Sequence, residues 1–180
     1  MKKILTLRWV LFLFAFLGIS MVAVQGAVRK KSEFKVPKGF ERESNFLPGV
    51  MPQQYYSKGD KKISIVIPPE YKMSRGAPIT QSGKLHPDFI NGKNKSARFF
   101  GFKNWKIEKY SINNIKNMTR LEVMGSYQSI DGKKNTFIEH HYFSKKNRER
   151  TISLIFTDGA NKKLLNEAKL SMNQFNPNFE

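Results

Sequence analysis

The sequence predicts an α+β domain in which an antiparallel β-sheet meander is closed by a C-terminal amphipathic helix. Three observations lead to this prediction. Residues 105–157 contain stretches of alternating polar and apolar side chains, separated by short turns. Residues 161–174 carry their apolar side chains along one helical stripe. Residues 63–67 form a further β-branched run, which the following prolines stop.

The first 26 residues have the layout of a secretory signal peptide. Lys2, Lys3 and Arg8 come first, an apolar run follows, and small residues precede Ala27. We therefore expect cleavage before Ala27 and no stable membrane span in the mature chain. An uncleaved anchor is the alternative, although the apolar run of residues 9–24 is short for a bilayer that needs about 20 residues.

The remaining 154 residues are strongly basic and lack cysteine. The net charge of the chain falls from +18 to +15 when the three cations of the signal segment are removed. This charge indicates attraction to anions without identifying which. We expect an envelope protein or an anionic envelope polymer as the partner, with nucleic acid as the less favoured alternative. Without cysteine there are no disulfides, thiol nucleophiles or acylated lipoprotein anchors. We expect a periplasmic protein, with secretion to the exterior as the alternative.

The chain divides into three parts. Residues 1–26 are the signal peptide, residues 27–60 are expected to be a proline-containing arm outside the core, and residues 61–180 form the α+β domain. Within the domain, residues 68–96 have no sustained period and contain several glycines and prolines, so they are expected to be a long irregular connection.

Two strands of the meander are predicted to form a hairpin. Asp131 and Gly132 are a turn signal after residues 118–128, because glycine easily adopts the positive φ of a tight turn. A two-residue turn predicts these cross-strand pairs: Tyr127 with Thr136, Val123 with His140, and Leu121 with Tyr142. One apolar face would then consist of Leu121, Val123, Ile138 and Tyr142.

A further turn leads to the last strand, residues 150–157, and then to the helix of residues 161–174. The order of these elements resembles the PsbP-like group. The resemblance rests on the strand and proline stop of residues 62–71, the later meander, the final strand and the C-terminal helix. It implies an exported α-β-α sandwich and an accessory or binding role without catalysis. It carries over no functional residue.

Glu139, His140 and His141 are the most conspicuous candidate chemical cluster. Adjacent strand residues point to opposite faces, so the two histidines cannot share one metal ion without distortion. The predicted register places His141 on one face with Glu139 and Glu122. Such a set could hold a divalent cation, but a paired surface charge cluster is the commoner explanation. A small hydrolase using His141 with either carboxylate is one alternative function.

No stronger catalytic or cofactor motif is present. The chain contains neither a G-x-S-x-G nor an S-x-x-K element, and its glycines form no phosphate-binding loop. We therefore expect no enzyme activity, no metal site and no cofactor.

A basic recognition surface is the leading candidate site. It combines cations of the long connection with cations of the turn before the last strand, and its members are Lys72, Arg75, Lys84, Lys93, Lys95, Lys145, Lys146, Arg148 and Arg150. Lys133 and Lys134 lie at the preceding turn and are expected at the opposite end of the sheet.

The function predicted from the sequence is therefore an exported basic binding or accessory protein of the bacterial cell envelope. A second alternative is a secreted protein that binds nucleic acid or acidic polysaccharide. It would use residues 98–106, where aromatic and basic residues are interspersed and Trp105 could stack on a base. A buried strand that enters the core explains the same aromatic residues more economically.

Overall fold

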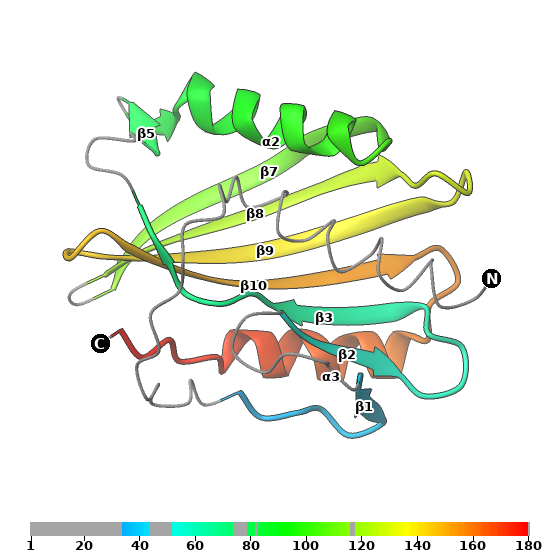
Figure 1. Ribbon diagram of the computed structural model, residues 1–180. Helices are drawn as coiled ribbons and strands as arrows, with labels where there is room; N and C mark the ends of the chain where they lie inside the picture. The colour runs from blue at the N-terminus through cyan, green and yellow to red at the C-terminus, as the bar shows by residue number, and fades with distance from the viewer. Residues whose placement is uncertain (1–33, 44–51, 74–78, 82, 116–117, 180) are drawn as a thin grey trace.

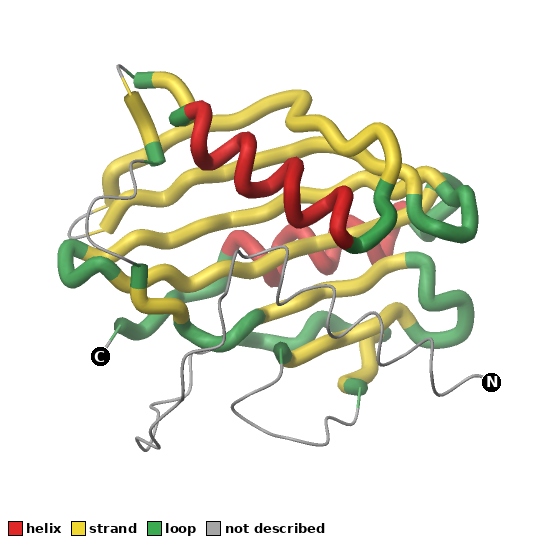
Figure 2. Tube along the Cα trace, turned by 45° about the horizontal axis from the view of Figure 1, so that its top comes forward, coloured by secondary structure: helices red, strands yellow, loops and turns green. Residues whose placement is uncertain are grey.

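The computed structural model describes residues 34–43, 52–73, 79–81, 83–115 and 118–179. They form an α-β-α sandwich, with α2 on one face of a large antiparallel sheet and α3 on the other (Figure 1, Figure 2). The strands are β1 (Phe40–Arg42), β2 (Gln53–Ser57), β3 (Ile63–Ile67), β4 (Tyr71–Lys72), β5 (Thr80–Gln81), β6 (Lys84–Leu85), β7 (Lys103–Ile115), β8 (Met118–Gln128), β9 (Lys134–Ser144) and β10 (Arg148–Thr157), and the helices are α2 (Pro87–Phe99) and α3 (Lys162–Asn173).

Within the described residues, the large sheet has eight strands. Seven follow the order β1-β2-β3-β10-β9-β8-β7, and the short strand β4 pairs with β10 beyond the end of β3. Strands β7 to β10 are the predicted meander, and α3 is the predicted C-terminal helix. The expected fold class is confirmed.

Each face of the sheet packs against one helix. On the face of α3, Ile63, Ile65, Ile152 and Leu154 are buried against Met172 and its neighbours. The opposite face carries a second core, which includes Leu121, Val123, Phe137, Phe143 and the α2 residue Ala97. Because strand side chains alternate between faces, β8, β9 and β10 each contribute to both cores, whereas β7 contributes to the core beneath α2.

The expectation that residues 27–60 lie outside the core needs correction. Strand β1 pairs with β2, and β2 pairs with β3, so residues 40–42 and 53–57 extend the sheet. Phe40 and Tyr55 are buried in the core beneath α3. These strands are short and lie among prolines and glycines, so only their tertiary pairing reveals them.

The irregular connection predicted for residues 68–96 is wrong for much of its length. Residues 87–99 form α2, which begins with Pro87 in its first turn. The Nδ1 atom of His86 accepts a hydrogen bond from the Asp88 N–H, which caps the helix start. A second hairpin, β5 with β6, lies just before this helix.

The predicted β8–β9 register is wrong by one residue. The loop contains three residues, Ile130, Asp131 and Gly132, because the Ser129 N–H donates to the Lys133 carbonyl. Gly132 adopts a φ of 81°. The observed pairs are therefore Tyr127 with Asn135, Val123 with Glu139, and Leu121 with His141. With a shift of one residue, each β8 side chain lies beside a β9 side chain that the predicted register placed on the opposite face of the sheet.

Candidate functional site

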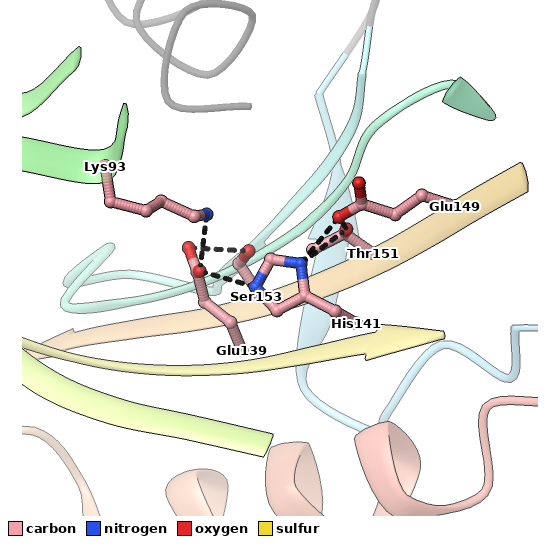
Figure 3. Close-up of polar contacts among 6 residues, drawn as sticks. All are labelled: Lys93, Glu139, His141, Glu149, Thr151 and Ser153. Atoms are coloured by element: carbon pink, nitrogen blue, oxygen red, sulfur yellow. Dashed lines mark hydrogen bonds and ion pairs between the residues drawn. The ribbon is translucent and has the colours of Figure 1, made fainter. Parts of the chain in front are cut away.

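A buried polar cluster lies between the sheet and α2, shown in Figure 3. Its residues come from α2, β9 and β10 and are joined by hydrogen bonds and ion pairs. They are Lys93, Glu139, His141, Glu149, Thr151 and Ser153.

Lys93 joins the helix to the sheet. Its Nζ atom lies 2.9 Å from Glu139 Oε2, and the two side chains are only 7% and 5% exposed. Burial alone would raise the pKa of Glu139, but Lys93 and His141 lower it to about 2. The carboxylate therefore stays charged, and its attraction to Lys93 holds α2 against β9.

His141 lies between two carboxylates. Its Nε2 is 3.0 Å from Glu139 Oε2, and its Nδ1 is 2.7 Å from Glu149 Oε1. Burial and Lys93 lower the pKa of His141, but its bonds to Glu139 and Glu149 outweigh them and raise it. Both ring nitrogens can donate in the imidazolium form, which balances the two carboxylates together with Lys93.

This geometry is that of a structural cluster. The His141 side chain is 0% exposed, and both of its ring nitrogens already face carboxylate oxygens. Lys93 already supplies a positive charge to Glu139. Among the described residues, no group of three or more histidine, aspartate and glutamate side chains is arranged to hold a metal ion.

The predicted partnership between His141 and Glu122 needs correction. The corrected register places Glu122 opposite His140, and its Oε2 lies 3.1 Å from His140 Nε2 on the face of α3. Burial lowers the pKa of His140 to about 4, although Glu122 opposes this shift. The sequence pattern does not reveal Glu149 as a partner of His141, because their contact depends on the pairing of β9 with β10.

The predicted basic surface is only partly exposed. Lys72, Lys84, Lys95, Lys145 and Lys146 are exposed, whereas Arg75 lies outside the described residues. Lys93 and Arg150 are buried, so their assignment to a recognition surface needs correction.

A carboxylate that the sequence did not single out explains the position of two arginines. Glu70 accepts from Arg148 Nη1 at 2.6 Å and from Arg150 Nε at 3.1 Å. Glu70 lies between β3 and β4, so these ion pairs fix that connection to β10. The two arginines are thus engaged within the fold.

The exposed lysines that remain near this connection form one group. Strand β4 pairs with the start of β10, with Lys72 opposite Arg148, and the Met73 N–H donates to the Asn147 carbonyl at 2.8 Å. Lys72 therefore lies beside the β9–β10 turn, which carries Lys145 and Lys146. We call Lys72, Lys145 and Lys146 the turn cluster. Lys133 and Lys134 lie at the opposite end of the sheet, as predicted (Figure 1).

The aromatic residues that the nucleic-acid alternative would use pack largely inward, in agreement with the buried strand expected from the sequence. The Phe102 ring stacks on Tyr127 with a centroid separation of 4.2 Å, and the Trp105 ring stacks on Phe137 at 5.7 Å. These four rings belong to the core beneath α2. Phe99 differs, because its side chain is exposed.

Comparison with known proteins identifies the fold. No family model and no curated protein matches the sequence. Cyanobacterial PsbP (CyanoP) from Synechocystis sp. PCC 6803 has a TM-score of 0.57 at 10% identity, covering 87% of this chain and 99% of its own. LpqN, described as involved in cell envelope biogenesis of Mycobacterium tuberculosis, has a TM-score of 0.51 at 14% identity, covering 79% and 80%.

The fold is therefore PsbP-like, as the sequence resemblance indicated. At these identities the likeness establishes the fold alone. None of the helices in the described residues is both long and apolar enough to cross a membrane.

Proposed function

We propose that this chain is an exported, non-enzymatic binding protein of the bacterial cell envelope, and that it recognises an anionic partner through the turn cluster. The observation that carries the proposal is the pairing of β4 with β10, which brings Lys72 beside Lys145 and Lys146. All three lysines are exposed.

Two classes of cation support this choice of surface. Lys93, Arg148 and Arg150 have carboxylate partners within the fold, so they stabilise structure. The turn cluster instead presents its charge to solvent at one end of the sheet. Exposed cations of this kind mainly accelerate and select encounters with an anionic partner.

The enclosure of His141 supports a binding role over hydrolysis. A general base must come within hydrogen-bond reach of the proton that it removes. His141 is fully buried and is held between Glu139 and Glu149, whereas Glu122 lies on the other face of the sheet. The hydrolase alternative therefore lacks an accessible base among these residues.

The description of one structural neighbour and the charge of the chain support an envelope location. LpqN is described as a protein of cell envelope biogenesis, and it shares this fold. The signal-like first 26 residues and the net charge of +15 that remains after their removal fit a chain that works among anionic envelope components.

Charge reversal tests the proposal. The double variant Lys145→Glu/Lys146→Glu should lose about tenfold or more of its affinity for isolated envelope material at moderate salt. The matched control is Lys162→Glu/Lys163→Glu, which makes the same charge change at two exposed lysines of α3. Sedimentation of the chain from Ala27, which contains every described element, measures both.

The control should bind like the wild type apart from a small effect of net charge. If both double variants weaken equally, the basic charge acts without a defined surface and the proposal is wrong. If neither variant weakens, the turn cluster is not the binding surface.

A further inference from the structure

The two most exposed large apolar side chains of the described residues lie at the end of the sheet opposite the turn cluster. Phe99 is 81% exposed at the C-terminus of α2, and Ile130 is 72% exposed in the β8–β9 loop. Both segments lie at the same end of the molecule in Figures 1 and 2. The two segments are close at Gly101, which follows α2. A Cβ built at this glycine would lie 3.2 Å from Ile130 Cγ1.

Backbone and side-chain hydrogen bonds hold these two residues outward. After α2, Gly101 has a φ of 74°, and the Phe102 N–H donates to the Ala97 carbonyl at 2.9 Å. This helix ending buries Phe102 in the core and leaves Phe99 in solvent. In the loop, the buried Ser129 hydroxyl donates to Asp131 at 2.5 Å.

Ile130 lies between these two polar residues and points away from the core. Its exposure is therefore a property of an ordered loop with a closing bond from the Ser129 N–H to the Lys133 carbonyl. The exposure of Phe99 likewise results from the way in which α2 ends. Together they present a small apolar tip.

Exposed basic residues adjoin Phe99 and Ile130 in the same two segments of the chain. The exposed cations of the same two segments are Arg98, Lys103, Lys133 and Lys134. The same two segments contain one exposed acidic residue, Asp131, and its Oδ2 lies 2.8 Å from Lys133 Nζ. The tip therefore combines apolar side chains with an excess of positive charge.

We propose that this tip, defined as Phe99 and Ile130 with the four cations Arg98, Lys103, Lys133 and Lys134, binds the surface of an anionic phospholipid bilayer. The apolar side chains enter the interface shallowly, and the cations bind headgroup phosphates. Each cation near such a surface adds attraction that falls off within a Debye length, and each buried apolar side chain adds a contribution independent of salt.

The size of the tip favours a bilayer over a second copy of the chain. An aromatic side chain buries about 150–250 Å², whereas a stable protein interface needs roughly 800 Å² from each partner. Phe99 and Ile130 alone fall well short of that area. A bilayer requires no matching surface, so two protruding side chains are sufficient to insert.

The test uses vesicles of defined composition and the chain from Ala27. We expect sedimentation with vesicles of equal parts phosphatidylcholine and phosphatidylglycerol, and much less with phosphatidylcholine alone. The variant Phe99→Ser/Ile130→Ser should lower the partition coefficient by about tenfold or more. Leu170→Ser is the matched control, because Leu170 is 58% exposed on α3 and lies outside the tip.

A second readout separates insertion from simple charge pairing. The variant Phe99→Trp should shift its fluorescence to shorter wavelength with the anionic vesicles, but not with inorganic phosphate. Raising the salt from about 0.1 M to about 1 M, which shortens the Debye length from about 10 Å to 3 Å, should weaken binding without abolishing the shift.

The proposal is overturned if Phe99→Ser/Ile130→Ser binds like Leu170→Ser, or if inorganic phosphate alone produces the fluorescence shift. Failure here leaves the turn cluster untouched, because Lys145→Glu/Lys146→Glu alters the opposite end of the sheet. Circular dichroism of each variant establishes that it is folded.

Discussion

Replacing Lys93 with methionine should strongly destabilise the fold. Lys93→Met keeps most of the apolar stem but removes the charge that lies 2.9 Å from Glu139. Removing one partner of a buried ion pair costs about 3–5 kcal/mol, because the other charge loses its compensation. His141 and Ser153 still bond Glu139, so we expect a value near the lower limit, about 3 kcal/mol.

Thermal and urea unfolding of the chain from Ala27 measure this effect. For a chain of this size, 1 kcal/mol corresponds to a melting shift of about 2–4 °C, so Lys93→Met should melt about 6–12 °C lower. Lys95→Met is the matched control, because Lys95 is an exposed lysine on the same helix. It should change stability by no more than about 0.5 kcal/mol.

A double variant tests whether the loss comes from the ion pair itself. In Lys93→Met/Glu139→Gln neither charge remains, so the loss should be smaller than the sum of the two single losses. Equal melting temperatures for Lys93→Met and Lys95→Met would refute the reasoning, because they would mean that the buried charge of Glu139 needs no partner from α2.

Two further predictions concern pH dependence and packing. Because the bonds from His141 to its two carboxylates raise its pKa above 6.5, the stability that it contributes is fully present below pH 6.5 and is lost as pH rises through the raised value. Urea unfolding should show that the free energy of unfolding declines as pH rises across this range, and His141→Gln should make this decline shallower. If the variant declines as steeply as the wild type, His141 is not an imidazolium in the folded state. Gly125→Ala should cost about 1–3 kcal/mol or more, because its Cβ would clash with the Lys106 carbonyl oxygen and lie 2.5 Å from Phe137 Cζ. A Cβ at Gly92 on α2 would have no neighbour within 4 Å, so Gly92→Ala should instead stabilise the fold by about 0.5–1 kcal/mol. Similar melting curves for the two alanine variants would show that Gly125 is not tightly packed.

The meander and the C-terminal helix could be predicted because their patterns are local. In β10, apolar Ile152, Leu154 and Phe156 alternate with their neighbours, and in α3 the apolar stripe ends at Met172. Burial of these positions matches the periods of strand and helix. The two strands β1 and β2 have no comparable local signal, because they depend on pairing with β3.

Helix α2 was missed because a buried lysine interrupts its apolar stripe. Phe89, Ile90 and Ala97 pack towards the core, but Lys93 occupies the position between them. The signals at its ends were present, since Pro87 lies in the first turn and Gly101 follows the last. The helix was therefore detectable from its ends rather than from its period.

The composition of the candidate sites depended on the strand register. A two-residue turn and a three-residue turn both fit Asp131 and Gly132, yet they place Glu139 and His141 against different neighbours. The sequence alone offers no measure of which turn forms. The ion pairs of Glu70 with Arg148 and Arg150 also depend on tertiary structure, because they form only where the connection from β3 to β4 lies beside β10.

The most direct test of the proposed binding role is site-specific photo-crosslinking in cells that produce the chain. A photoreactive amino acid is placed at Lys145 in one variant and at Lys162 in another, both of which are exposed lysines. We predict a discrete adduct with an envelope component from position 145 that is absent from position 162. The same set of adducts from both positions, or none from position 145, would contradict recognition through the turn cluster.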